Sequence, residues 1–167
     1  MEIRKSKIED IHQILEVIHD AQESMRDSGI PQWQDGYPNE VIIFQDIQAE
    51  NSCVLVDEKR IVGTAYIIAE HEPSYDYIEG GQWLNNHLYV VVHRIAVRKD
   101  CRGKGIARYI MEFAEKIAKE HQLHDIRIDT HDDNLPMRKF LLKLGYHACG
   151  TIYLDNGDKR IAYQKTF

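Results

Sequence analysis

The most informative residues form a glycine turn between an apolar segment and a helical pattern. Residues 89–97 are β-branched and apolar, the basic turn at 102–105 contains Gly103 and Gly105, and a helical pattern starts at Ile106. Glycine lets main-chain N–H groups approach a ligand closely, and the first N–H groups of a helix have no partner within it. The helix dipole also favours negative charge there. The segment therefore predicts a phosphate or pyrophosphate site.

Two common nucleotide-binding motifs do not fit this turn. A Walker loop requires Lys and then Ser or Thr after its glycines, whereas Ile106 follows Gly105. A dinucleotide-binding G-x-G-x-x-G motif would need glycine where Arg108 stands, and no βαβ unit precedes the turn. The run from Arg102 to Ala107 fits R-x-x-G-x-A instead. The alternative is an ordinary strand-to-helix turn with a solvated basic face.

A second motif lies at residues 134–146, where Asn-Leu-Pro-Met-Arg-Lys-Phe-Leu-Leu-Lys-Leu-Gly-Tyr matches much of N-x-x-A-x-x-L-Y-x-K-x-G-F. An alternating segment at 126–130 separates the two motifs. Together they resemble the GNAT superfamily of N-acetyltransferases, whose acyl-CoA pyrophosphate loop is R-x-x-G-x-A. The resemblance is strongest over residues 88–150 and weak elsewhere.

The resemblance implies an acetyl-CoA-dependent N-acetyltransferase with an α/β fold. We expect a single mixed, mostly antiparallel sheet of about seven strands with helices on both faces. Its fourth and fifth strands would separate, with the pantetheine arm of acetyl-CoA in the gap. The cofactor would contact the fourth strand, the glycine turn and the second motif. The corresponding residues are Ile95, Ala96 and Val97; Arg102, Gly103, Lys104, Gly105, Ile106 and Ala107; and Asn134, Arg138 and Lys143.

Acetyl transfer requires a neutral amine, so a base or a water chain must remove a proton from the substrate. We expect His93 to be this base, because it lies on the fourth strand and histidine as a residue type titrates near neutral pH. A structural histidine, hydrogen-bonded to a neighbour such as Arg94 or Asp129, is the alternative. Asp129 and His131 are second choices for the base, and helix capping is the alternative for them.

The sequence departs from the family pattern at Leu141, where relatives usually have a tyrosine that protonates the departing thiolate. Leucine cannot donate a proton. Tyr153 and Tyr146 are candidate acids, and bulk water is another, because a thiolate is a good leaving group. Cys149 and Cys101 are interpreted as packing residues, since neither has an obvious paired histidine.

Several aromatic residues outside the two motifs are candidates for the acceptor site. With acidic neighbours they could form a pocket for an amine, although loop aromatics packed on the core are the alternative. The aromatic candidates are Trp33, Tyr75 and Trp83, with Tyr37 and Tyr77 nearby, and the acidic ones are Glu72, Asp76 and Glu79.

The elements that must position these residues follow from periodicity and capping signals. The predicted order is strand, two helices, three strands, helix, strand, helix and two strands. Ser6 with Glu9 predicts the start of the first helix, and Gly29 its end. Asn39 and Asn134 predict caps of two later helices. A final hairpin is predicted at 146–154 and 159–165, across an Asn-Gly turn.

Composition favours a single domain over 1–167 in a reducing cytoplasm. The chain has 167 residues, 43% of them hydrophobic, and an odd count of three cysteines. Nine histidines show no metal-site spacing, so no metal is expected. The net charge of −6 argues against a nucleic-acid partner, and no apolar run is long enough to span a membrane.

The expected partner is therefore a small-molecule or peptide amine. A homodimer is implied by many relatives. Two rival functions remain open at this point. One is a CoA-binding sensor or inactive module, because Leu141 replaces the tyrosine that relatives usually have. The other is a protein or peptide acetyltransferase, which an open acidic groove would favour over a closed aromatic pocket.

Overall fold

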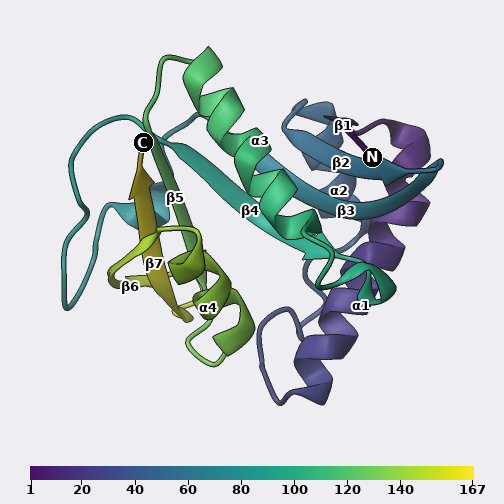
Figure 1. The fold of residues 1–167 in the computed structure, drawn as a ribbon. Coiled ribbons are helices and arrows are strands. Elements are labelled where there is room, and N and C mark those ends of the chain that lie inside the picture. The colour runs from purple at the N-terminus through teal and green to yellow at the C-terminus, as the bar shows by residue number, and fades with distance from the viewer. The chain divides into compact units, whose positions relative to one another are not determined.

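A computed structural model describes all residues from 1 to 167. The elements follow the predicted order, with short 3-10 helices added (Figure 1). They are β1 (Glu2–Lys5), η1 (Ile8–Asp10), α1 (Ile11–Asp27), α2 (Glu40–Gln48), β2 (Ser52–Asp57), β3 (Arg60–Ile68), η2 (Pro73–Tyr75), β4 (Val90–Val97), η3 (Lys99–Cys101), α3 (Ile106–Glu120), β5 (Asp125–Thr130), α4 (Leu135–Lys143), β6 (His147–Tyr153) and β7 (Lys159–Thr166).

The strands form one mixed sheet of seven strands in the order β1-β2-β3-β4-β5-β7-β6. The pairs β1–β2, β2–β3, β5–β7 and β6–β7 are antiparallel. Strands β4 and β5 are parallel, with Val90 opposite Ile126 and Val91 opposite Arg127. The predicted fold class, a mixed and mostly antiparallel sheet, is confirmed. The predicted separation of β4 from β5 beyond these two residue pairs stays a prediction.

The chain divides into two compact units. The first unit consists of Met1–Ile67 and His93–Phe113, and the second of Ile68–Val92 and Ala114–Phe167. The boundary passes through β4 and α3, so each of these elements contributes to both units. The single domain over 1–167 stays a prediction.

The core of the first unit is apolar and joins two helices to three strands. The spacing of the buried positions in α1 places them on one helical face, which is the amphipathic pattern of a helix packed on a sheet. Burying these side chains removes apolar area from water, which is the main favourable contribution to folding. The cluster consists of Ile14, Val17 and Ile18 from α1, Ile43 and Ile47 from α2, and Val54, Ile61 and Ala96 from the strands.

A β-bulge in β3 sets which of its residues face this core. Leu55 pairs with Gly63 and Val56 pairs with Ile61, which leaves Val62 as the extra residue. Because side chains alternate along a strand, the bulge puts Ile61 on the same face as Val56 and puts Gly63 on the opposite face. Helices α1 and α2 therefore cover one face of the first unit, and the other face is free for α3.

Helix α3 approaches that second face closely because Gly63 has no side chain. A Cβ at Gly63 would lie 2.9 Å from both Ile106 Cγ2 and Ile110 Cδ1. Any larger residue would push the start of α3 away from the sheet. Helices thus cover both faces of the first unit, as predicted, and Gly63 fixes the place where α3 begins.

The second unit has its own core and the predicted C-terminal hairpin. Tyr75, Tyr89, Val91, Ile152 and Ala162 are packed together, with partly buried neighbours around them. Strands β6 and β7 are joined by the Asn-Gly turn. The ends of both strands lie within a residue or two of the predicted positions. Strand β5 is buried on nearly its whole length, so its charged residues as well as its isoleucines face the interior.

The predicted start of the first helix at Ser6 is wrong. Ser6 Oγ lies 2.7 Å from Ser52 Oγ, and η1 intervenes before α1. The Asp10 carboxylate accepts from the Lys7 N–H at 2.7 Å and is held by Arg4 at 2.7 Å. Lys7 is therefore the N-cap of η1 with Asp10 as its partner three residues on, so the capping pair lies one residue later than predicted.

The other predicted helix boundaries are confirmed. Asn39 Oδ1 accepts from the Ile42 N–H at 3.1 Å, and Asn134 Oδ1 accepts from the Met137 N–H at 3.3 Å. Gly29, directly after the α1 C-cap, has a φ of 71°, a left-handed conformation that glycine adopts readily.

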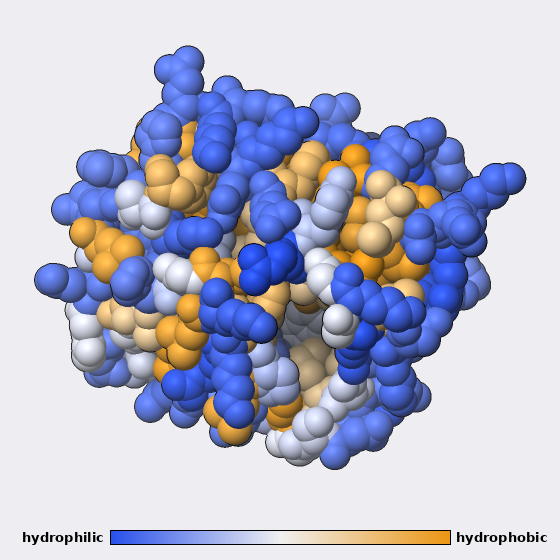
Figure 2. Space-filling model, in the orientation of Figure 1, coloured by the Kyte–Doolittle hydropathy of each residue, from blue (hydrophilic) through white to orange (hydrophobic).

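The visible face of the molecule is largely hydrophilic, with scattered apolar patches (Figure 2). No helix is both long enough and apolar enough to cross a membrane.

Candidate functional site

The predicted anion site is a left-handed glycine turn between β4 and α3. Gly103 has a φ of 76° and Gly105 a φ of 82°. A Cβ at either position would meet nothing within 4 Å. The turn therefore requires glycine at both positions because of the positive φ, and not because a side chain would collide with a neighbour. The space above the two glycines is open to a ligand.

The N-terminus of α3 presents main-chain donors at this turn. The first main-chain bond of the helix runs from the Tyr109 N–H to the Gly105 oxygen at 3.0 Å. The N–H groups of Ile106, Ala107 and Arg108 precede that bond, so the helix offers them no acceptor. Free N–H groups and the positive end of the helix dipole form a site for a phosphate group.

The segment leading into the turn is anchored to α1 and β3. Arg98 Nε donates to the Ile61 oxygen at 2.6 Å, and its guanidinium also pairs with Glu16. The Lys99 N–H donates to Asp20 Oδ2 at 2.9 Å. These contacts fix the path of the chain from β4 into the turn without using the N–H groups at the start of α3.

The Arg102 side chain faces α1. Its Nη1 donates to Ser24 Oγ at 2.6 Å, and its Nη2 donates to the main-chain carbonyl oxygen of Asp20 at 3.1 Å. The cofactor contact that the sequence predicted for Arg102 stays a prediction, and these hydrogen bonds anchor its guanidinium to α1. Lys104 is exposed at the tip of the turn.

An ion pair that no sequence signal indicated holds the middle of β4. Arg94 has a φ of 52° and forms two hydrogen bonds with Asp46 of α2, both 2.7 Å long. Tyr37 Oη accepts a third at 2.7 Å, and the guanidinium lies 4.4 Å from the centre of the Tyr66 ring. Burial raises the pKa of the Asp46 carboxyl above its usual value, although Arg94 opposes the shift. The pair thus fixes the backbone directly before Ile95.

The three predicted main-chain contacts for the pantetheine arm follow this ion pair in β4. Ala96 is buried, whereas Ile95 and Val97 are half-buried. His93, the predicted base, is also half-buried, and its ring centre lies 6.1 Å from that of Tyr66. The tilted contact with Tyr66 restricts the orientation of the imidazole.

The second-choice base, Asp129, is hydrogen-bonded to a core tyrosine. Tyr75 Oη donates to Asp129 Oδ2 at 2.8 Å. Tyr75 is only 2% exposed, and burial raises the pKa of its hydroxyl well above the usual value, so the proton stays on the tyrosine. The Asp129 carboxylate therefore has a clear positioning role toward Tyr75.

The two tyrosines predicted as acids differ in their surroundings. The Tyr153 hydroxyl donates to the Glu79 carboxylate. This hydrogen bond raises the pKa of Tyr153. Tyr146 is buried with no hydrogen-bond partner for its hydroxyl, and burial raises its pKa well above the ordinary value. Leu141 is 0% exposed, so the family's usual tyrosine position is a core position in this chain.

The predicted cofactor residues of the second motif hold the start of α4. Asn134 caps the helix, and Arg138 Nε donates to Tyr163 Oη at 3.2 Å. Arg138 Nη1 also donates to the Asp132 oxygen at 3.0 Å. Lys143 is exposed in the last turn of α4.

The cysteines interpreted as packing residues are buried free thiols. Burial raises the pKa of Cys149 and of Cys101, and it raises the pKa of Cys53 to about 12. A thiol with a raised pKa is a poor nucleophile.

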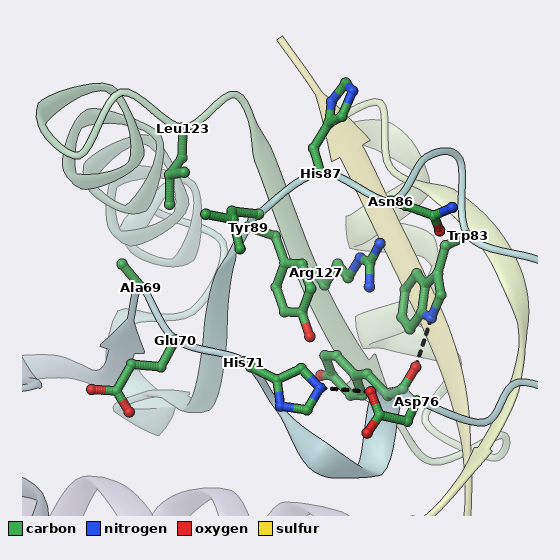
Figure 3. Close-up of a pocket in the computed structure, with 12 residues that line it drawn as sticks. Ala69, Glu70, His71, Asp76, Trp83, Asn86, His87, Tyr89, Leu123 and Arg127 are labelled. Carbon is green, nitrogen blue, oxygen red and sulfur yellow. Dashed lines mark hydrogen bonds and ion pairs between the residues drawn. The ribbon is translucent and has the colours of Figure 1, made fainter.

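Two of the three aromatic residues predicted for the acceptor site lie together. Trp83 Nε1 donates to the main-chain carbonyl oxygen of Tyr75 at 2.9 Å, and the centres of the two side-chain rings are 5.1 Å apart. Both line a cavity of the second unit (Figure 3). Trp33 lies in the first unit, where it packs against the apolar core with a φ of 63°.

The fourth strand of this mixed sheet leads through a glycine turn into an open helix N-terminus, which is an anion site. The family model described as the acetyltransferase (GNAT) family matches residues 14–146. The chain belongs to this family, which places it among the acyltransferases. The family assignment predicted from the two motifs is confirmed.

Known structures and proteins agree with this assignment. The chain is similar to a GNAT-family acetyltransferase structure from Streptococcus agalactiae 2603, with 37% identity, a TM-score of 0.89, and coverage of 99% of this chain and 95% of that chain. The PaiA N-acetyltransferase from Thermoplasma acidophilum, solved in complex with coenzyme A, is 17% identical with a TM-score of 0.71 and coverage of 99% and 98%. That likeness shows the fold alone.

A curated protein is similar over a shorter segment. The streptothricin acetyltransferase of Escherichia coli is 38% identical over 65 residues. These residues are 39% of this chain and 37% of that protein, so the similarity spans little more than a third of the relative's length.

Proposed function

We propose that this protein transfers the acetyl group of acetyl-CoA to a primary amine of a small molecule or peptide, by direct attack in a ternary complex. The observation that carries the proposal is the turn at Gly103 and Gly105, with open space above both glycines and free N–H groups at the start of α3. Such a site stabilises a pyrophosphate without any side-chain charge. Acetyl-CoA is the acetyl donor that the family uses.

The proposed cofactor contacts come from three places. The N–H groups of Gly103 to Ala107 would hold the pyrophosphate, with Lys104 adding a positive charge. Main-chain groups of Ile95, Ala96 and Val97 would pair with the pantetheine arm as an added strand does. Arg102 would act by anchoring the turn to α1, since its guanidinium already donates to Ser24 and Asp20.

The second motif contributes less directly to this proposal. Asn134 and Arg138 hold the start of α4 through their hydrogen bonds, so their role toward the cofactor would be positioning. Lys143 is exposed and is kept as a proposed cofactor contact. No metal is part of the proposal.

In the proposed reaction, the amine nitrogen attacks the thioester carbonyl, the carbon–sulfur bond breaks, and the amine loses a proton. His93 would accept that proton directly or through one water. A main-chain N–H of β4 would stabilise the charge on the carbonyl oxygen, and such a donor contributes about 2.7–4 kcal/mol in comparable sites. No covalent enzyme intermediate is needed, which agrees with the buried cysteines.

The proton for the departing thiolate would come from Tyr153 or from water. The Tyr153 hydroxyl keeps its proton through the hydrogen bond to Glu79, whereas the Tyr146 hydroxyl is buried and cannot easily exchange with solvent. Asp129 is the weaker candidate for the base, because its carboxylate already accepts from Tyr75. Tyr75, Trp83 and Trp33 remain the proposed acceptor-side aromatics.

The proposal also covers the binding partners of the protein and its location in the cell. The net charge of −6 disfavours nucleic acid. A cytoplasmic location and a homodimer belong to the same proposal. A dedicated protein or peptide acetyltransferase remains the alternative enzyme function.

The test is a screen of primary amines that follows thiol release from acetyl-CoA. Transfer to one amine with saturable kinetics would support the proposal. The rival is a CoA-binding sensor or inactive module, which stays open because Leu141 stands where relatives usually have a tyrosine. Tight acetyl-CoA binding by calorimetry, with no thiol release above the hydrolysis rate against any small or peptide amine, would establish the rival.

A further inference from the structure

The second unit contains a cavity that the cofactor motifs do not use. Its volume is about 380 Å³, within the roughly 300–1,000 Å³ typical of small-molecule sites. The walls come from the chain after β3, from the loop before β4, and from the start of β5. The residues that line it include His71, Asp76, Trp83, Tyr89, Leu123 and Arg127 (Figure 3).

The Arg127 guanidinium lies between two aromatic rings of this cavity. Its carbon is 4.1 Å from the centre of the Trp83 ring and 4.0 Å from the centre of the Tyr89 ring. Figure 3 shows the guanidinium extending between the two side chains. Arg127 is only 5% exposed. The stack holds the planar cation in one orientation, with its edge left for hydrogen bonds.

The hydrogen bonds of this buried cation are incomplete. Nη2 donates to the Asn85 oxygen at 2.7 Å, whereas Nε is buried without a partner. The nearby Asp125 carboxylate forms no ion pair with Arg127: its Oδ1 accepts from Asn85 at 2.8 Å, Gln164 at 2.8 Å and Thr166 at 2.5 Å, and its Oδ2 lies 3.3 Å from His87 Nδ1. Arg127 therefore lacks the paired carboxylate that a buried arginine normally has.

Burial without an ion-pair partner is unfavourable for a charged group. Loss of hydration lowers the pKa of the Arg127 guanidinium below its ordinary value. An anion that entered the cavity would restore this lost stabilisation, because hydrogen bonds between ionised partners are strong in a poorly hydrated site.

The acidic residues of the cavity do not fill this role. Asp76 Oδ1 lies 2.6 Å from His71 Nε2, so its carboxylate is occupied by the imidazole. Glu70 extends away from Arg127 in Figure 3. The remaining walls combine Leu123, Leu88, Ala69 and the aromatic rings with the polar side chains of Asn86 and His87, so a ligand would meet one cationic edge, an apolar wall and a polar wall.

We propose that this cavity binds a small carboxylate with an apolar or aromatic body. The carboxylate accepts hydrogen bonds from the edge of the Arg127 guanidinium, and the body packs against the apolar wall that includes Leu123. Trp83 and Tyr89 hold the guanidinium in place by stacking. The cavity shares Tyr75 and Trp83 with the proposed acceptor side, but binding of the carboxylate needs neither acetyl-CoA nor acetyl transfer.

The test uses Trp83 as an internal reporter. The sequence has two tryptophans, so Trp33→Phe leaves Trp83 alone. We expect titration of this variant with phenylacetate to give a saturable fluorescence change, with a dissociation constant of about 1 mM or tighter. Phenylacetamide, the neutral analogue of nearly equal size, should bind at least about tenfold more weakly, because it cannot pair with the cation. Equal affinities for the two probes, or no saturable change with either, would overturn the proposal.

A charge-removing variant tests the same assignment on the protein side. Arg127→Gln in the Trp33→Phe background should weaken phenylacetate binding about tenfold or more, whereas Arg26→Gln on the exposed end of α1 should leave it unchanged. Far-ultraviolet circular dichroism establishes that both variants fold. Should Arg127→Gln not fold, the comparison of the two probes on the parent variant still decides the outcome. Unchanged affinity in a folded Arg127→Gln protein would refute the site.

The titrations contain no acetyl-CoA and measure no turnover. A negative result here would therefore leave the proposed acetyl transfer untouched, and a failed amine screen would leave this cavity untouched.

Discussion

His93 is the residue on which the proposed proton transfer depends. We predict that His93→Ala lowers turnover by about 10²-fold or more while acetyl-CoA affinity is retained, because general base catalysis typically contributes about 10²–10⁴-fold. The acidic limb of the rate profile should also disappear. Steady-state kinetics across pH and calorimetry with acetyl-CoA measure these quantities.

The control for this variant is His12→Ala, which removes a histidine that is 87% exposed on α1. It should leave both the turnover and the acidic limb unchanged. If His93→Ala folds and keeps its turnover and its acidic limb, His93 is a structural residue and ionisation of the amine alone sets the pH dependence.

Leu141 tests whether the reaction needs the tyrosine that relatives usually carry. We predict that Leu141→Tyr changes turnover less than tenfold, because a thiolate leaves readily without a dedicated acid. The position is fully buried, so the larger side chain should cost about 1–3 kcal/mol of stability through overpacking. Thermal unfolding and thiol release measured on the same sample separate the two effects.

Leu142→Tyr is the matched control, since this neighbouring residue is 55% exposed and tolerates a ring. A gain of tenfold or more in turnover for Leu141→Tyr alone would show that the enzyme lacks an acid that it needs.

At the scale of elements, the join between β4 and α3 is the part that the proposed cofactor site requires. We predict that Gly105→Asp abolishes measurable acetyl-CoA binding by calorimetry. The φ of 82° strains any other residue by about 1–2 kcal/mol, and a carboxylate at the helix N-terminus would repel the pyrophosphate.

The hairpin between β6 and β7 offers a control with the same backbone conformation. Gly157 has a φ of 85°, and a Cβ there would also meet nothing within 4 Å. Gly157→Asp should lower the Tm by a similar amount and leave acetyl-CoA affinity unchanged. Unchanged affinity in Gly105→Asp would remove the main support for the cofactor site.

At the scale of the whole molecule, acid sensitivity follows from buried carboxylates. Burial alone would raise the pKa of Asp10, but hydrogen bonds from Arg4 and from the Lys7 N–H more than offset it, and the pKa is lowered. A lowered folded pKa contributes stability above the unfolded value of about 3.9, and that stability is lost as pH falls through the folded value.

We therefore predict that Asp10→Asn loses less stability than the parent protein when pH falls from about 6 to about 3. Urea unfolding at the two pH values gives the free energies of unfolding. Asp27→Asn, at the exposed end of α1, should lose as much as the parent. An Asp10→Asn protein with the same pH dependence as the parent would contradict the assignment of this linkage to Asp10.

The sequence by itself determined the order of the elements, the fold class and the family. These depend on local signals: apolar periodicity, the caps at Asn39 and Asn134, and the glycine turn before α3. Each involves residues within a few positions of one another, so the chain needs no distant partner to reveal them. Ser6 is the exception, because the capping pair is Lys7 with Asp10, and the Asp10 carboxylate is held by Arg4 of β1.

Only the tertiary structure decided which partners the charged residues take. Arg94 pairs with Asp46, Arg102 turns to α1, and Arg127 is stacked between Trp83 and Tyr89. The alternation of β5 indicated which residues share a face, but a strand in the interior of a sheet buries both faces, so charge in the sequence did not imply exposure. Partners that are far apart in the sequence come together only when helices and strands pack, and a linear pattern contains no record of that packing.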